Sequence, residues 1–328
     1  MPAIAAERLT KHFSPDIRAV DGIDLDIPEG QIFGFLGQNG SGKTTTVRML
    51  TTLLRPTAGE ARVLGLDVRR RAPDVRRRIG VALQEAGLDD LQTGRELLAL
   101  QARLYGVPSS QVKRRVNDLL EIVDLVEAAD RPTKGYSGGM KRRLDLAAAL
   151  VHSPPLLFLD EPTTGLDPIS REAIWRYVRE LNRRDGVTFF LTTQYLEEAD
   201  RLADNVAIMD AGTIVAQGSP SALKASIGAD VVTVRLAGGV EQLLRAESVV
   251  RSLEGITDAR TLDDALVIYV PDGAAAIARI VLLLNAESLE AREITVHRPA
   301  LDDVFLRATG HHLEADASVP AAAAGRGR

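Results

Sequence analysis

The sequence contains no cysteine and no hydrophobic run long enough to span a membrane. Without cysteine, disulfides and thiolate metal sites are excluded, and a reducing compartment is permitted. A spanning helix needs about 20 apolar residues, but the longest uncharged run near the middle, Leu146–Leu159, is interrupted by Pro154 and Pro155. The N-terminus also lacks a signal-peptide pattern. We therefore expect no direct membrane insertion, and any membrane role must depend on a partner.

An excess of positive charge is also lacking, because the net charge is -5 and 26% of the residues are charged. Binding to bulk phosphate favours a basic surface, so nucleic acid is not expected as a partner. The arginine clusters at Arg69–Arg71 and Arg76–Arg78 are expected to be solvated helix faces. The 328 residues, 45% of them hydrophobic, allow one large domain and one small one.

Apolar runs alternate with helical patterns up to about residue 220, which predicts an α/β domain with a buried parallel sheet. A helix over Lys43–Leu53 follows a glycine-rich turn, and only helical patterns occur between Thr93 and Val151. The Asp210–Gly212 turn is expected to join two short strands. The predicted strands are Ile4–Leu9, Ile23–Ile27, Ile32–Leu36, Ile79–Leu83, Leu156–Leu159, Val187–Leu191 and Asn205–Met209.

After Gly228 the pattern changes to the order β-α-β-β-α-β, which predicts a ferredoxin-like α+β sandwich. Its predicted elements are Val231–Leu236, Val240–Leu253, Ile256–Thr261, Leu266–Val270, Ala274–Leu284 and Ile294–His297, with a short helix at Leu301–Leu306. The predicted domains are therefore 1–226, with a helical subdomain at about 88–152, and 229–310. The tail, 315–328, is rich in Ala and Gly and is expected to be disordered.

A glycine-rich turn from Gly37 to Thr44 matches the P-loop pattern of nucleotide-binding proteins. Its backbone N–H groups can surround a phosphate at the positive end of the following helix. Lys43 is expected to reach the β- and γ-phosphates, and Thr44 to bind Mg²⁺. The residues expected to contact ATP here are Gly37, Asn39, Gly40, Ser41, Gly42, Lys43, Thr44 and Thr45.

Two carboxylates, Asp160 and Glu161, follow the apolar run Leu156–Leu159. A Mg–ATP site needs an acid at a strand end near the P-loop, so Asp160 is expected to hold Mg²⁺ and Glu161 to act as the general base. By itself the pair would be read as a strand entering a turn at Pro162. The P-loop on the same type of sheet makes the catalytic interpretation the better one.

A third motif, Tyr136-Ser-Gly-Gly-Met140, precedes a helix and resembles the signature of ABC transporter ATPases. A Ser-Gly-Gly turn alone would only cap a helix, but here it precedes a run, Asp160 to Asp167, that is similar to the Walker B motif and D-loop of the same family. The resemblance implies that two copies close head to tail. Each ATP would then lie between one P-loop and the partner's Ser137, Gly138 and Gly139, with Asp167 near the opposite site.

The resemblance also assigns two isolated residues. Phe13 matches the aromatic residue that stacks on adenine, although a loop residue packed on the core is the competing interpretation. Gln84 matches the glutamine that senses Mg²⁺ and faces the permease. The family further implies a separate permease subunit and a location at the cytoplasmic face of the membrane.

One departure from the family concerns the position after the strand at Val187–Leu191, where a histidine usually contacts the γ-phosphate. This chain has Gln194, whose amide can donate a hydrogen bond but cannot become charged. Since Lys43, Asp160 and Glu161 are present, we expect hydrolysis to survive, with Gln194 as a catalytic residue.

The segment from Thr192 to Asp200, the signature and the segment from Pro299 to His311 together resemble the daunorubicin-resistance-type branch of exporter ATPases. Members of that branch export drugs, polyketides or lipids. An importer ATPase usually keeps the histidine and has a barrel-like C-terminal domain, and a non-transport ABC protein usually has two fused ATPase domains or a long insert. The second domain could add dimer contacts or brace the ATPase, and Pro299–Leu306 could be a docking or a packing helix.

Overall fold

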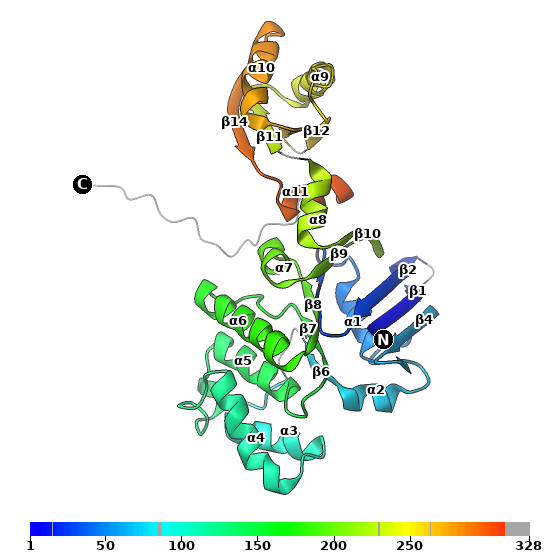
Figure 1. The fold of residues 1–328 in the computed structure, drawn as a ribbon, viewed down its shortest axis with the longest axis vertical. Helices are drawn as coiled ribbons and strands as arrows, with labels where there is room; N and C mark the ends of the chain where they lie inside the picture. Colours follow the sequence, from blue (N-terminus) through cyan, green and yellow to red (C-terminus); the bar gives the residue numbers. More distant parts are fainter. Residues whose placement is uncertain (15, 84–86, 229, 263, 312–328) are drawn as a thin grey trace, which may run out of the picture. The chain divides into compact units, whose positions relative to one another are not determined.

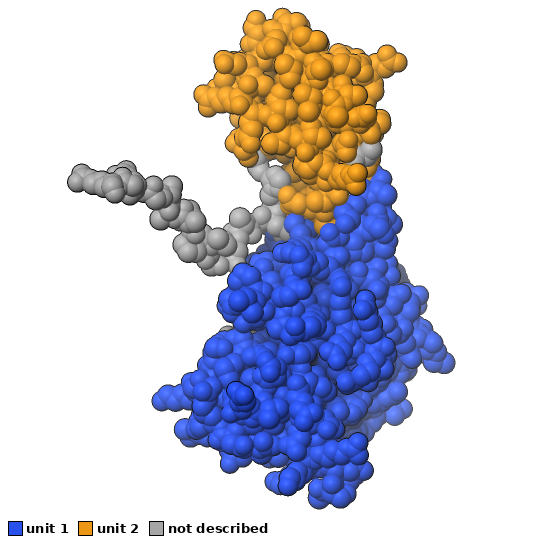
Figure 2. Space-filling view, turned by 60° about the vertical axis from the view of Figure 1, so that its left-hand side comes forward, with its two compact units in different colours: residues 1–226 blue, residues 227–328 orange. Residues whose placement is uncertain are grey.

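The computed structural model describes residues 1–14, 16–83, 87–228, 230–262 and 264–311. The chain divides into two compact units, Met1–Ser226 and Ile227–Arg328, drawn in blue and orange in Figure 2. Gln84 and the predicted disordered tail, 315–328, lie outside the described residues. Among the described residues, no helix combines the length and the apolar character needed to cross a bilayer.

The centre of the first unit is a six-stranded sheet in the order β10-β9-β3-β8-β7-β6. Every neighbouring pair is parallel except β9 and β10, which the turn at 210–212 joins. The predicted parallel sheet is thus confirmed. Its strands are β3 (Ile32–Leu36), β6 (Ile79–Ala82), β7 (Leu156–Asp160), β8 (Thr188–Thr193), β9 (Asn205–Asp210) and β10 (Thr213–Gly218).

A second, antiparallel sheet has the order β2-β1-β4-β5. Its strands are β1 (Pro2–Ser14), β2 (Ile17–Pro28), β4 (Ala58–Val63) and β5 (Leu66–Asp67). The sequence predicted parts of β1 and β2 but not β4 or β5, since β4 reads Ala-Gly-Glu-Ala-Arg-Val and has almost no β-branched or aromatic residues to mark it. In Figure 1 this sheet and the helices α5 and α6 lie on opposite sides of the central strands.

Eight helices complete this unit within the described ranges. They are α1 (Lys43–Leu50), α2 (Ala72–Arg78), α3 (Gly94–Leu104), α4 (Ser109–Ile122), α5 (Gly138–Ala149), α6 (Pro168–Asp185), α7 (Leu196–Leu202) and α8 (Pro220–Ile227), with a 3₁₀ turn at Thr133–Gly135. Helix α1 ends before the predicted Leu53, because Thr51 is its C-cap and Thr52 has a left-handed φ of 67°.

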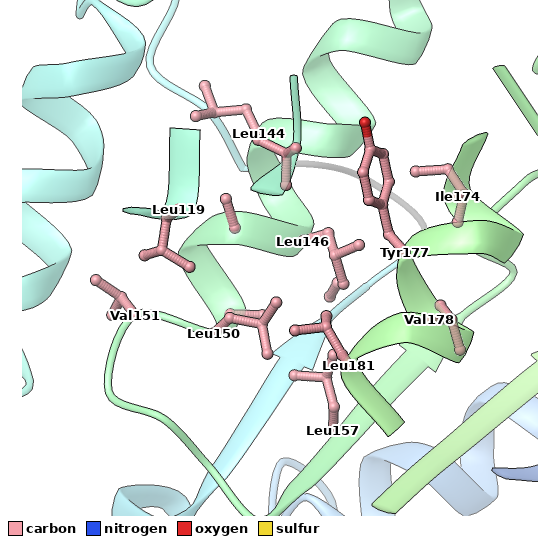
Figure 3. Packing of buried hydrophobic residues seen from close by; sticks show 14 of the residues in the cluster. Leu119, Leu144, Leu146, Leu150, Val151, Leu157, Ile174, Tyr177, Val178 and Leu181 are labelled. Carbon is pink, nitrogen blue, oxygen red and sulfur yellow. The ribbon is translucent and has the colours of Figure 1, made fainter. Parts of the chain in front are cut away.

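Side chains from α5, α6 and β7 form the core that holds α5 in place. Leu146 of α5 and Leu150, the residue that caps its C-terminus, pack with Leu181 of α6 and Leu157 of β7 (Figure 3). Alternate residues of β7, such as Phe158, face the opposite core, which is shared with the antiparallel sheet. The inner strands β3, β7 and β8 are therefore buried on both faces, which explains why they read as continuous apolar runs.

The second unit has the predicted β-α-β-β-α-β order, and its antiparallel sheet has the strand order β12-β13-β11-β14. The ferredoxin-like prediction is thus confirmed. Helix α9 ends three residues before the predicted Leu253, in a turn at Arg251–Leu253. The elements are β11 (Asp230–Leu236), α9 (Val240–Val250), β12 (Asp258–Leu262), β13 (Ala265–Val270), α10 (Gly273–Ala286), β14 (Ala291–His297) and α11 (Leu301–Thr309).

Candidate functional site

Three segments that carry predicted site residues leave the same edge of the central sheet. The P-loop follows β3, the carboxylate pair lies at the end of β7, and Thr192, Thr193 and Gln194 lie at the end of β8. Since β8 lies between β3 and β7, the three carboxyl ends converge, as is typical of ligand sites in parallel sheets.

The glycines of the P-loop are required by its backbone geometry. Gly40 and Gly42 have left-handed φ values of 81° and 111°, and a Cβ on Gly37 would lie 2.4 Å from the carbonyl oxygen of Met209. Helix α1 begins directly after Gly42, so its free N–H groups point into the loop. The pocket over this loop is lined by Ala19, Asn39, Gly40, Gly42, Lys43, Thr44, Thr45 and Glu161.

We expect Gly42→Ala to weaken ATP binding at least about tenfold, because a left-handed alanine costs roughly 1–2 kcal/mol. In addition, its Cβ would meet the carbonyl oxygen of Ala19 at 2.2 Å. The matched control is Gly40→Ala, which has the same cost of a positive φ but nothing within 4 Å of the added Cβ, so its loss should be smaller. Titration with a fluorescent ATP analogue measures both; equal losses in the two variants would contradict the steric argument.

The two carboxylates at the end of β7, Asp160 and Glu161, contact residues of the P-loop. Asp160 Oδ1 accepts hydrogen bonds from Thr44 Oγ1 at 3.2 Å and from Thr192 Oγ1 at 2.5 Å. Lys43, 4% exposed, donates from Nζ to the carbonyl oxygens of Gly37 and Gln38 at 2.7 and 2.9 Å. Its Nζ also lies 3.6 Å from Glu161 Oε1. Burial lowers the pKa of Lys43, and the Glu161 and Asp160 carboxylates oppose that shift.

The main chain at Glu161 is held in an unusual conformation. Its φ is 49°, which is left-handed for a non-glycine residue. Its N–H donates to the carbonyl oxygen and the hydroxyl of Thr192, at 3.1 and 3.0 Å, and its Oε2 accepts from Thr164 Oγ1 at 3.3 Å. These bonds fix a carboxylate at the mouth of the phosphate pocket, where it can accept a proton from water.

The donor set at this edge also fits Mg²⁺. The hydroxyl of Thr44 and the carboxylate of Asp160 are hard oxygen ligands, which this ion prefers, and they lie within hydrogen-bond distance of each other. Both are beside the loop that would hold the phosphates, where Mg²⁺ usually binds.

The signature residues and Asp167 are brought together in a different place. Ser137 caps α5 by accepting from the Met140 N–H at 3.2 Å, and Ser137 and Gly138 are exposed. A Cβ on Gly139 would lie 2.6 Å from Ser170 Oγ, which itself donates to Asp167 Oδ2 at 2.6 Å. Ser137, Gly138, Gly139 and Asp167 lie outside the set that lines the P-loop pocket.

The other predicted residues have mixed outcomes. Phe13 lies on β1 and is 57% exposed, with Lys11 Nζ 5.3 Å from its ring centre, so the competing interpretation of a loop residue packed on the core is wrong. Gln194 is half-buried directly after β8. The Gln84 prediction falls on a residue that the structure does not describe.

Sequence reasoning missed a buried group behind the site. Glu198 on α7 is fully buried and accepts from Thr163 Oγ1 at 2.9 Å and from Trp175 Nε1 at 2.8 Å. Burial raises its pKa. It connects the turn after Glu161 to α6 and α7. Thr192, which holds both Asp160 and Glu161, was also missed; the only available signal was a polar pair at the end of an apolar strand.

Residues 20–164 match the ABC transporter family, and residues 218–309 match the C-terminal domain of DrrA1-3-like ATP-binding proteins. The chain is 44% identical to the daunorubicin resistance ATP-binding protein DrrA2 of Streptomyces coeruleorubidus, over 95% of this chain and 96% of that protein. It is 45% identical to the daunorubicin/doxorubicin resistance ATP-binding protein DrrA of Streptomyces peucetius, over 94% and 93%.

More distant similarity extends to other transport proteins. The chain is 39% identical to the Nod factor export ATP-binding protein I of Cupriavidus metallidurans, over 95% of this chain and 99% of that protein. Among solved structures, cbiO1 from Clostridium perfringens, part of the ABC transporter complex cbiONQ, matches with a TM-score of 0.64 and 28% identity, over 68% and 91% of the two chains. The dimeric ATP-binding cassette MJ0796 bound to ADP and Pi matches with a TM-score of 0.61 and 25% identity, over 66% and 98%.

Proposed function

The chain belongs to the ATP-binding proteins of ABC transporters, in the daunorubicin-resistance branch, and from this premise we propose that two copies bind two ATP molecules head to tail and drive export through a separate permease. The observation that carries the proposal is that the P-loop and the signature turn lie apart, and we propose that each is half of an ATP site. The P-loop pocket and the turn at Ser137–Gly139 belong to one chain, but no residue of the turn lines that pocket. A second copy would complete each of them.

In this proposal the residues of the first half-site bind and activate ATP. The P-loop amides and Lys43 hold the phosphates, and Glu161 accepts a proton from the attacking water. Thr44 and Asp160 hold Mg²⁺, which neutralises charge on the phosphate oxygens when bound. Gln194 donates its amide hydrogen bond to the γ-phosphate, Gln84 contacts Mg²⁺, and Phe13 stacks on adenine. Contacts to the γ-phosphate from both chains close the dimer, and hydrolysis releases it.

The cargo in this proposal is a hydrophobic drug, a polyketide or a lipid, and the chain acts at the cytoplasmic face of the membrane, attached through the permease. The supporting observations are the relatives' resistance and export names and a C-terminal unit that is an open four-stranded sheet. Importer ATPases usually have a barrel-like domain there, so an importer or a non-transport ABC ATPase is the weaker alternative.

Mixing two inactive variants tests the head-to-tail site. Lys43→Ala damages the P-loop half, and Ser137→Phe fills the signature half, so each homodimer has two defective sites. A mixed dimer has one site in which Lys43 of one copy and Ser137 of the other are both intact. We expect co-expressed, doubly tagged dimers to recover up to about half of wild-type ATP turnover, with inactive homodimers as controls. No recovery in the mixed dimer would contradict the shared site.

A further inference from the structure

Arg142 is a buried arginine on α5 whose contacts are not explained by packing alone. It is 8% exposed and lies one turn along α5 from the Ser137 cap. Burial lowers its pKa, and the nearby Asp145 carboxylate opposes that shift. Burying a guanidinium costs free energy unless its N–H donors have acceptors. The acceptors of Arg142 therefore show which part of the chain it stabilises.

The guanidinium of Arg142 donates hydrogen bonds to the main chain on both sides of Glu161. Nη2 donates to the carbonyl oxygen of Asp160 at 2.9 Å, and Nε donates to that of Pro162 at 3.0 Å. Glu161 itself has the left-handed φ of 49°. A planar fork that binds the two flanking carbonyls can stabilise such a turn, and a point charge such as lysine cannot bind both with the same geometry.

The contacts of Arg142 Nη1 connect the turn at Glu161 to the end of β6 and to Asp145 of α5. Nη1 donates to the carbonyl oxygen of Leu83, just after β6, and to Asp145 Oδ2, which lies 3.1 Å away on α5. Asp145 is itself largely buried, and burial raises its pKa to about 6. Through its contact with Nη1, Asp145 orients the guanidinium from within the same helix.

We propose that Arg142 is a positioning residue for ATP hydrolysis, which transmits the position of α5 to the main chain that aims the Glu161 carboxylate. The inference rests on the proposed function, because α5 begins at the Ser137 turn. In a head-to-tail dimer that turn contacts the ATP held by the partner, whereas Glu161 acts on the ATP held by its own chain. Arg142 thus links the two nucleotide sites of the dimer through one side chain.

Arg143 provides a matched control on the same helix. Its Nη1 donates to the carbonyl oxygens of Val123 and Asp124, at 3.1 and 3.2 Å, and these lie within the helical part of the unit. Like Arg142 it binds main-chain carbonyls, but those carbonyls follow α4 and do not belong to the turn that carries Glu161. A loss that came only from weaker bracing of α5 would therefore affect both arginines.

The test measures ATP turnover and nucleotide affinity of the full chain with its permease for Arg142→Gln, Arg142→Lys and Arg143→Gln. We expect both Arg142 variants to lose about tenfold or more in kcat. Their affinity for a fluorescent ATP analogue should change less than about threefold, while Arg143→Gln should stay within about twofold of wild type in both. The Hill coefficient for ATP should also fall in the Arg142 variants.

Equal kcat in Arg142→Gln and Arg143→Gln would overturn the inference. A wild-type kcat in Arg142→Lys, or a loss of ATP affinity in parallel with kcat, would also overturn it. If Arg142→Gln does not fold by circular dichroism, Asp145→Asn provides the test. It keeps Arg142 but removes the carboxylate charge that orients its guanidinium, so kcat should fall about threefold or more at unchanged affinity. An unchanged kcat refutes the role. Absence of turnover in the wild type and in Arg143→Gln alike would instead overturn the proposed ATPase function together with this inference.

Discussion

Replacing Glu161 with glutamine is expected to lower ATP turnover about 10³-fold, because the amide cannot accept the proton of the attacking water. The substitution keeps the size of the side chain, and the main-chain bonds to Thr192 do not depend on the carboxylate. ATP binding should therefore be retained. Turnover of the protein with its permease, followed by phosphate release, measures the effect.

The same variant should accumulate as an ATP-bound dimer, since in the proposed cycle closure needs ATP and opening needs its hydrolysis. Light scattering after gel filtration distinguishes dimer from monomer. A variant that remains monomeric at every ATP concentration would count strongly against the head-to-tail dimer. The control is Glu172→Gln, an exposed glutamate on α6 that pairs with Arg201, which should behave as wild type.

The Glu161→Gln baseline also tests the interpretation of Gln194. If the wild-type protein turned over ATP no faster than Glu161→Gln, an amide at position 194 could not replace the usual histidine. We expect the wild type to be clearly faster, because Lys43, Asp160 and Glu161 all lie at the same edge of the sheet.

Replacing Lys43 with alanine is expected to lower kcat/KM about 10²-fold or more, through loss of the buried cation that we propose binds the phosphates. Lys43 is 4% exposed and its ammonium lies among carbonyl oxygens and the Glu161 carboxylate. Because the variant loses an interaction with the bound ATP as well as with the transition state, both affinity and kcat should fall.

The control for this variant is Lys141→Ala, which removes a lysine on α5 that pairs with Asp90 at 2.6 Å. A partly exposed pair of this kind contributes little to stability, so turnover should stay within about twofold of wild type. An equal loss in the two lysine variants would mean that Lys43 acts through general charge and not through its position in the loop.

The parts of the site that the sequence predicted are those carried by residues consecutive in the chain. The glycine spacing from Gly37 to Thr44 predicts a phosphate-binding loop. The position of Asp160 and Glu161 directly after an apolar run predicts two carboxylates at a strand end. The parallel sheet was predictable for a similar reason, because burial on both faces produces uninterrupted apolar runs.

The parts that the sequence did not predict depend on contacts between distant segments. Nothing in the sequence indicates that Thr192 bonds Asp160, or that Arg142 reaches the carbonyls around Glu161, because main-chain acceptors leave no residue-type signal. Strand β4 was missed since its small and charged residues have weak strand propensity.

Trp175 is the chain's one tryptophan, and its indole N–H ends on the buried carboxylate of Glu198, which also binds the turn after Glu161. The protein thus contains one intrinsic fluorophore, and it is connected through Glu198 to the turn that follows Glu161. A change in that hydrogen bond alters the emission of the indole, so rearrangements of this turn during a catalytic cycle can be followed in real time without an attached dye.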